Sequence, residues 1–259
     1  MTSYPLRGFY AFFLRQYCAP SVPRWGRAGD DADFIQGVTW LSFPGYPGRI
    51  GACRFSLSRY RDEGAYQGIA LPLSLQQAAP KRQAEFIAGR WVAHQVMTAL
   101  GICDGVIARG ADHAPQWPPG IAGSISHAAG MALCAAHPTS RRGGVGIDVE
   151  TWLAPSRACT LQSAIAHPHE LAALLGTAPA SRLLITLLFS AKESLFKALY
   201  PEVKRWFDFH DAQMTAIDWR RRTFRLTLLT SLASDYPAGR CFHGQFLSDD
   251  EAVMTLIYC

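Results

Sequence analysis

The sequence has no apolar run long enough to cross a membrane and no pair of cysteines at metal-binding spacing. A spanning helix needs about 18 consecutive apolar residues, so we expect no membrane segment. The seven cysteines are scattered and odd in number, which argues against a zinc site or a disulfide framework and favours a reducing cytoplasm. Arg7 and Arg15 interrupt the apolar start, and no small-residue cleavage site follows, so we expect no signal peptide.

The motifs of nucleotide-binding loops and of nucleic-acid-binding patches are also missing. No Gly-Lys-Ser/Thr sequence occurs, and the glycine-rich residues 143–146 precede a predicted strand rather than a helix. The formal net charge is +5, and the longest basic run is the three arginines at 220–222, which is too sparse for nucleic-acid binding. A mild positive balance suits anionic ligands or acidic protein partners.

The remaining composition is that of a globular protein with a mixed α/β pattern. Apolar residues make up 49% of the 259 residues and charged residues 17%, which predicts a packed core rather than disorder. Periodicity predicts helices over 80–100 and 181–199, and either a strand pair or a strand with a turn at Ala129-Gly130 over 123–136. It also predicts strands over 207–217, 224–229, 241–246 and 252–258. A polar, basic joint at 139–144 divides the chain into predicted domains 1–140 and 141–259.

The most informative residues are charged side chains inside two otherwise apolar segments. Residues 146–150 alternate, so Asp148 and Glu150 point to the same side of a predicted strand. In the helix predicted over 181–199, Glu193 and Lys197 lie one turn apart, beside the apolar stripe. If the helix packs beside the strand, Glu193 joins Asp148 and Glu150 at one metal ion, and Lys197 reaches a phosphate held there. Charge in apolar surroundings usually has a partner or a chemical role.

Each segment also has an ordinary interpretation. Glu193 and Lys197 also fit a surface ion pair, which contributes only a few tenths of a kcal/mol. Asp148 and Glu150 also fit the solvent-facing side of an edge strand. The two segments together favour a site, but spacing alone does not decide between these interpretations.

Several ordered motifs resemble those of the 4'-phosphopantetheinyl transferases. Gly-Ile-Asp-Val-Glu at 146–150, followed by Ser-Ala-Lys-Glu-Ser at 190–194 and then Lys197, is similar to the signature pair of the stand-alone, surfactin-type enzymes. Further matches point to the enterobactin-synthetase component D subgroup, at residues 81–90, 117–118, 123–127 and 189–201. The resemblance covers residues 71–209.

The resemblance implies an α/β (α+β) fold with pseudo-two-fold symmetry, in which two similar halves each carry a small sheet and a long helix. It implies transfer of 4'-phosphopantetheine from coenzyme A to a serine of an acyl or peptidyl carrier protein, with release of 3',5'-ADP. It also implies dependence on Mg2+, which prefers oxygen ligands such as the carboxylates of Asp148, Glu150 and Glu193. Lys197 would neutralise the leaving phosphate, and Glu193 would act as general base for the carrier serine. A metal-bound carboxylate is a poor base, so Glu193 would act through water or leave the metal.

The resemblance also assigns the binding of coenzyme A to residues Lys81, Arg82, Arg90, His113, Ser126, His127 and Lys197. The cations of residues 81–90 also fit an ordinary helix surface, and the Ser-His pair also fits a strand end. Two positions depart from the family pattern. His113 stands where relatives usually carry Arg or Lys, which puts this phosphate contact in doubt because neutral histidine binds phosphate less well. Phe189 replaces a common tryptophan, as in the enterobactin-type subgroup.

Two other functions stay open at this point. The same carboxylates suit a Mg2+-dependent phosphohydrolase, in which water rather than a protein serine accepts the phosphoryl group. A coenzyme A-binding or carrier-binding module without turnover is the second alternative, and the combined presence of Asp148, Glu150, Glu193 and Lys197 argues against it. Siderophore, polyketide and fatty-acid carriers all remain candidate substrates. The resemblance favours a monomer, and the charge pattern and short apolar runs predict that it binds no nucleic acid and no membrane.

Overall fold

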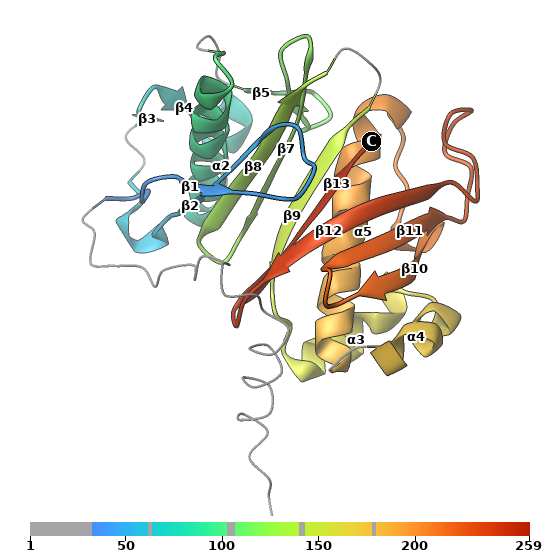
Figure 1. Cartoon of the computed structure of the whole chain (residues 1–259). Helices are drawn as coiled ribbons and strands as arrows, with labels where there is room; N and C mark the ends of the chain where they lie inside the picture. Colours follow the sequence, from blue (N-terminus) through green and yellow to red (C-terminus); the bar gives the residue numbers. More distant parts are fainter. Residues whose placement is uncertain (1–32, 62–63, 103–106, 140–142, 178–179) are drawn as a thin grey trace, which may run out of the picture. The chain divides into compact units, whose positions relative to one another are not determined.

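The computed structural model describes residues 33–259 except 62–63, 103–106, 140–142 and 178–179 (Figure 1). The helices are α2 (Pro80–Ala99), α3 (Pro155–Ile165), α4 (Pro168–Leu174) and α5 (Ser181–Val203). Short 3-10 turns are η1 (Leu57–Arg59), η2 (Leu73–Leu75), η3 (Leu175–Thr177) and η4 (Phe209–Asp211). The mixed α/β class predicted from the sequence is confirmed.

The strands form two larger sheets and two short ribbons. One sheet has the order β1-β2-β8-β7, and the other has the order β10-β11-β12-β13-β9. The ribbons pair β3 with β4 and β5 with β6. The strands are β1 (Thr39–Leu41), β2 (Arg49–Arg54), β3 (Ala65–Tyr66), β4 (Ile69–Ala70), β5 (Ala108–Arg109), β6 (Pro115–Gln116), β7 (Ile121–Ala128), β8 (Met131–Pro138), β9 (Val145–Thr151), β10 (Ala212–Asp218), β11 (Thr223–Leu228), β12 (Cys241–Ser248) and β13 (Ala252–Tyr258).

Contacts divide the described residues into two compact units, neither of which is continuous in sequence. The α2 unit comprises residues 33–149, Glu193–Lys204 and Leu256–Cys259. The β12 unit comprises Glu150–Lys192 and Arg205–Thr255. The predicted division into domains 1–140 and 141–259 stays a prediction, as does the symmetry between the halves.

In the α2 unit, helix α2 covers one face of the antiparallel sheet β1-β2-β8-β7 (Figure 1). Pro80 stands in the first turn, where its missing N–H costs nothing, and Gly101 follows the helix end with a φ of +79°. Val92, Ala93 and Val96 are fully buried against the sheet. Burying a side chain the size of valine contributes about 1.5–3 kcal/mol, so this face holds the helix in place.

The strand pair predicted over 123–136 is β7 and β8, which pair from Ile121↔Pro138 to Ala128↔Met131. Ala129 and Gly130, which connect them, have φ angles of +45° and +79°. Two positive φ angles match the twist of a two-residue hairpin. The turn predicted at these residues is therefore confirmed, and it fixes the register of β7.

In the β12 unit, β10, β11 and β12 form an antiparallel meander, and α4 contacts β10. The prediction that a strand starts at residue 207 is wrong by five residues. Asp208 accepts the backbone N–H of His210, and Asp211 accepts the backbone N–H of Asp208, which closes the 3-10 turn η4 before β10 begins at Ala212. The predicted helix 181–199 is also longer than expected, since α5 continues past Pro201 to Val203.

Candidate functional site

Strand β9 approaches helix α5 at two glycines of the α2 unit. A Cβ atom added to Gly144 would lie 1.9 Å from the carbonyl oxygen of Ala198, and one added to Gly146 would lie 1.8 Å from that of Ser194. Real Cβ atoms do not come this close to a backbone oxygen, so both positions require glycine. Residues 144, 146 and 148 alternate onto one side of the strand, so Asp148 follows the two glycines on the side that faces α5. The predicted packing of the acidic strand against the long helix is thus confirmed for this unit.

Asp148 and Lys197 meet at this contact. The Lys197 Nζ lies 2.6 Å from Oδ1 of Asp148, 3.0 Å from Oγ of Ser126 and 3.3 Å from the carbonyl oxygen of Ile147. Ser126 donates its own hydroxyl to the same Oδ1 at 2.8 Å. The Asp148 side chain is 4% exposed, against 25% for Lys197. Sequence spacing alone left this acid open to a solvent-facing interpretation, and the structure buries it beside a lysine.

Glu193 is the half-buried carboxyl one helical turn before Lys197. Burial raises its pKa; the Lys197 ammonium lowers it and repulsion from Asp148 raises it, with a net rise. A carboxyl with a raised pKa accepts a proton more readily at neutral pH. The structure therefore brings Asp148, Glu193 and Lys197 into one electrostatic cluster.

The third predicted carboxylate, Glu150, follows on the same strand and belongs to the β12 unit. Among the described residues, no group of three or more His, Cys, Asp and Glu side chains is arranged to hold a metal ion. The three-carboxylate set thus stays a prediction. One observation does suit a cation: Oδ2 of Asp148 is buried and has no hydrogen-bond partner in the described part of the chain. A buried carboxylate oxygen without a donor matches the oxygen ligands that Mg2+ prefers.

A pocket of about 120 Å³, the cationic pocket, gathers four of the seven residues predicted to bind coenzyme A, namely Arg82, Arg90, His113 and His127. It lies in the α2 unit, and the charged or titratable side chains that line it are Arg82, Glu85, Arg90, Arg109, His113 and His127. Nε atoms of Arg90 and Arg109 are buried without a hydrogen-bond partner among the described residues. Burial lowers the pKa of Arg90 to about 10, which leaves it charged at neutral pH. Three guanidinium groups facing one small space make a site for an anion.

Two charged residues of this pocket, Arg109 and Glu85, were not predicted from the sequence. Arg109 belongs to β5, a strand of two residues that is too short to be predicted from periodicity. In the sequence, only its position four residues before His113 indicated that it could take part in the site. Glu85 lies within the motif at 81–90, but a carboxylate was not expected among phosphate-binding residues. His113 does line the pocket, with a φ of +67°.

Arg82, His127 and Glu85 form a connected group. Nη1 of Arg82 lies 2.8 Å from Nε2 of His127, and Nδ1 of His127 lies 3.6 Å from Oε2 of Glu85. Burial lowers the pKa of His127 to about 4, and the positive charges of Arg82, Lys197 and Lys81 add to this effect. His127 is therefore neutral at pH 7. Lys81 does not line the pocket; its side chain is 73% exposed and lies 3.9 Å from Glu85.

Lys192, the other lysine of the helical motif, has a separate environment in the β12 unit. Its Nζ donates to the carbonyl oxygens of Ile165 and Phe209, both at 2.9 Å, and to Oε2 of Glu170 at 2.8 Å. The two charged side chains are 2% and 0% exposed. Lys192 is thus part of a buried ion pair with all three of its protons engaged.

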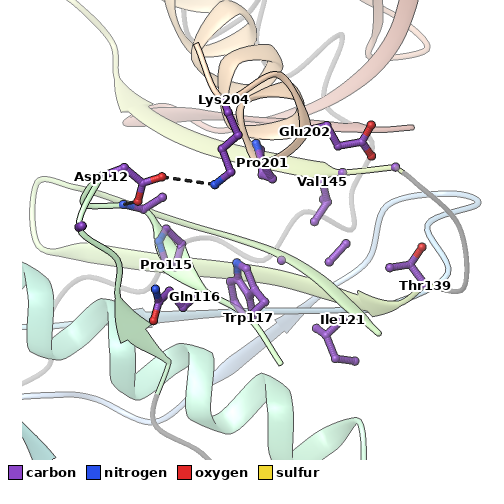
Figure 2. A pocket seen from close by; sticks show the side chains of 16 residues that line it. Asp112, Pro115, Gln116, Trp117, Ile121, Thr139, Val145, Pro201, Glu202 and Lys204 are labelled. Atoms are coloured by element: carbon purple, nitrogen blue, oxygen red, sulfur yellow. Dashed lines mark hydrogen bonds and ion pairs between the residues drawn. The ribbon is translucent and has the colours of Figure 1, made fainter. Parts of the chain in front are cut away.

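A larger pocket of about 840 Å³ lies in the α2 unit near the end of α5. Figure 2 shows Trp117 in its lining and the ion pair between Asp112 and Lys204, which is 3.3 Å long. Pro115 belongs to the lining of this pocket and of the cationic one. No helix in the described part of the chain has both the length and the apolar character needed to cross a bilayer.

Comparisons with known proteins agree with the motifs. The profile of the 4'-phosphopantetheinyl transferase N-terminal domain matches residues 71–137, and that of the 4'-phosphopantetheinyl transferase superfamily matches residues 144–252. The 4'-phosphopantetheinyl transferase PptT of Mycobacterium tuberculosis is 30% identical over 188 residues, which cover 71% of this chain and 82% of that protein. Enterobactin synthase component D of Salmonella typhimurium is 33% identical over 219 residues, which cover 84% of this chain and 88% of that protein.

The chain is therefore a transferase. It belongs to the 4'-phosphopantetheinyl transferases, which transfer phosphopantetheine to carrier proteins, and it is related to the enterobactin synthase component D subgroup. A transferase is neither the phosphohydrolase nor the non-enzymatic module that the sequence left open.

Proposed function

We propose that this chain transfers 4'-phosphopantetheine from coenzyme A to a serine of an acyl or peptidyl carrier protein, releases 3',5'-ADP and depends on Mg2+. The observation that carries the proposal is the presence, in one compact unit, of a pocket lined by three arginines and the cluster of Asp148, Glu193 and Lys197. Coenzyme A has a 3'-phosphate and a pyrophosphate, so it needs two separate sites for negative charge.

The 3'-phosphate goes to the cationic pocket. Arg82, Arg90 and Arg109 supply guanidinium donors there, and the volume of about 120 Å³ suits a single phosphate group. Arg109 supplies a cation beside His113, the position where relatives usually carry one. A guanidinium stays charged at all physiological pH values, so Arg109 replaces the Arg or Lys that relatives carry at the position of His113.

The pyrophosphate goes to the Asp148 cluster. Asp148 and Glu193, together with Glu150, would hold Mg2+, which would stabilise negative charge on the leaving phosphate. Lys197 provides a positive charge at the same place. Ser126 holds Asp148 in position and is engaged there rather than in the lining of the cationic pocket.

Glu193 takes the proton of the carrier serine. Because a metal-bound carboxylate is a poor base, it does so through a water molecule or after leaving the metal, and a positioned base contributes about 10²–10⁴ in rate. The serine oxygen then attacks the β-phosphorus of coenzyme A, the bond from that phosphorus to the bridging oxygen breaks, and 3',5'-ADP leaves.

Carrier domains of siderophore synthesis are the first candidates for the substrate, because several relatives are named enterobactin synthase component D. Polyketide and fatty-acid carriers are the other classes to compare. The proposal includes a monomer that acts in the cytoplasm.

The test is intact mass spectrometry of apo-carriers of the three classes, incubated with the protein, coenzyme A and Mg2+. Transfer adds one phosphopantetheine, about 340 Da, and a chelator should prevent the gain. Glu193→Gln should abolish the gain while coenzyme A still binds, and Glu202→Gln, at the far end of α5, is the matched control. Consumption of coenzyme A without a gain in carrier mass would refute the proposal, and full activity of Glu193→Gln would refute the role of the base.

A further inference from the structure

The hydrogen bond between Arg82 and His127 fixes where the imidazole carries its proton. A guanidinium has only donors, so Nε2 of His127, 2.8 Å from Nη1 of Arg82, must accept. The proton of the neutral ring is then on Nδ1, which faces Oε2 of Glu85 at 3.6 Å. In this state the ring presents no donor toward the Arg82 side of the pocket.

Glu85 is a carboxylate in a pocket that otherwise gathers positive charge. Its side chain is 14% exposed and lies 3.8 Å from Arg82 and 3.9 Å from Lys81. A carboxylate here repels a phosphate, so its presence needs an explanation. Its position on the Nδ1 side of His127 provides one, because a carboxylate beside an imidazole favours the doubly protonated ring.

A bound phosphate that accepts from Arg82 would remove the donor from Nε2 of His127. The Nε2 lone pair would then face phosphate oxygens, and two acceptors cannot form a hydrogen bond with each other. The ring can resolve this in two ways. Moving its proton from Nδ1 to Nε2 leaves a lone pair facing Glu85. Taking up a second proton gives both ring nitrogens a donor that faces an acceptor, phosphate on one side and Glu85 on the other. The second arrangement satisfies every group.

We propose that binding of the 3'-phosphate is coupled to the uptake of one proton from solvent on Nε2 of His127, and that Glu85 is the positioning residue that makes this uptake favourable. The inference rests on the proposed function, because it takes the pocket as the 3'-phosphate site. The free ring is uncharged at neutral pH, since burial and nearby cations lower its pKa to about 4, so uptake starts from the neutral form. Besides His127, the charged and titratable side chains that line this pocket are Arg82, Glu85, Arg90, Arg109 and His113, and the charges of Lys81 and Lys197 also act on the His127 ring from outside the lining.

The test is calorimetric titration of the whole protein with coenzyme A and with 3'-dephospho-coenzyme A, at pH 7 in two buffers of different ionisation enthalpy. A phosphate monoester has a second pKa near 6, so binding of the dianion alone would release about 0.1 proton. The proposal predicts uptake of 0.5 to 1 proton for coenzyme A and none for the dephospho form. By linkage, the Kd of coenzyme A should then rise about three- to tenfold per pH unit.

The outcomes separate this proposal from the proposed function. If neither compound binds, the proposed function fails. If both bind equally, or if coenzyme A binds with release of protons, only the proton-coupled site fails. Glu85→Gln should reduce proton uptake and weaken coenzyme A binding about tenfold while leaving the dephospho form unaffected, and Glu202→Gln should change neither.

Nitrogen NMR of the histidine ring tests the same point without any substitution. The free protein should show His127 with its proton on Nδ1, and the complex with 3',5'-ADP should show both nitrogens protonated. A ring that stays neutral in the complex, with its single proton moved to Nε2, would overturn the proposal.

Discussion

Replacing Lys192 with methionine should strongly destabilise the fold. Lys192 donates to Glu170 and to two backbone carbonyls, and both charged side chains are almost completely buried. Glu170 uses its other oxygen to accept the backbone N–H of Met214 at 2.6 Å. Methionine fills nearly the same volume but leaves a carboxylate and two carbonyls without their common donor. Breaking one partner out of a buried pair costs about 3–5 kcal/mol.

The assay is urea and thermal denaturation monitored by circular dichroism, with a double-mutant cycle that adds Glu170→Gln. For a chain of this length, a loss of 3–5 kcal/mol corresponds to a fall in Tm of about 6–20 °C. The double variant should be less destabilised than the sum of the two single variants, because it no longer buries an unpaired charge. Lys204→Met, which removes an exposed ion pair with Asp112, is the control and should cost less than about 1 kcal/mol. A loss below about 1 kcal/mol for Lys192→Met would show that the buried pair contributes little.

Two further predictions concern the α2 unit. Gly146→Ala would place a Cβ atom 1.8 Å from the carbonyl oxygen of Ser194, so we expect the free energy of unfolding to fall by about 2 kcal/mol or more and transfer to be impaired. The control is Gly37→Ala, which has nothing within 4 Å and should be neutral in the same denaturation and mass assays. Wild-type-like stability of Gly146→Ala would contradict the close approach. The pKa of His127 is about 4 in the folded protein and 6.5 in the unfolded chain, so the unfolded state binds more protons between these two pH values. The stability that this residue contributes therefore falls as the pH drops from 6.5 to 4. His127→Gln should remove about 2–3 kcal/mol of this pH dependence, measured as the difference in unfolding free energy between pH 7 and pH 4.5, and an unchanged dependence would refute the shifted pKa.

Local patterns in the sequence were sufficient for much of the fold. Helix α2 has a proline in its first turn, a buried apolar face and a glycine after its end, and all three signals act within about 20 residues. The hairpin at Ala129-Gly130 follows in the same way from turn chemistry. The start of β10 was misplaced because the Asp208 and Asp211 side chains satisfy the backbone of residues 208–211 in a turn, which strand periodicity does not show.

The site was predictable where one contact joined two marked segments. Alternation in β9 and helical spacing in α5 indicated that Asp148, Glu193 and Lys197 would meet, and within the α2 unit they do. Spacing did not reveal the role of Glu85 or Arg109, because their importance comes from which side chains surround them in space. Spacing placed Lys197 beside Glu193 but assigned no role to Lys192, which the fold buries in an ion pair with Glu170.

Gly144, just before β9, and Gly146, within it, have a consequence for the interpretation of sequence variation among homologues. Neither Gly144 nor Gly146 has a side chain with which to bind anything, yet any larger residue would collide with a carbonyl group of α5. In a mutational scan of this enzyme, both positions should be as intolerant as the acids that follow them. An invariant glycine at 144 or 146 would then reflect the close approach of the backbones of β9 and α5, whereas an invariant aspartate at 148 would reflect the need for a negative charge.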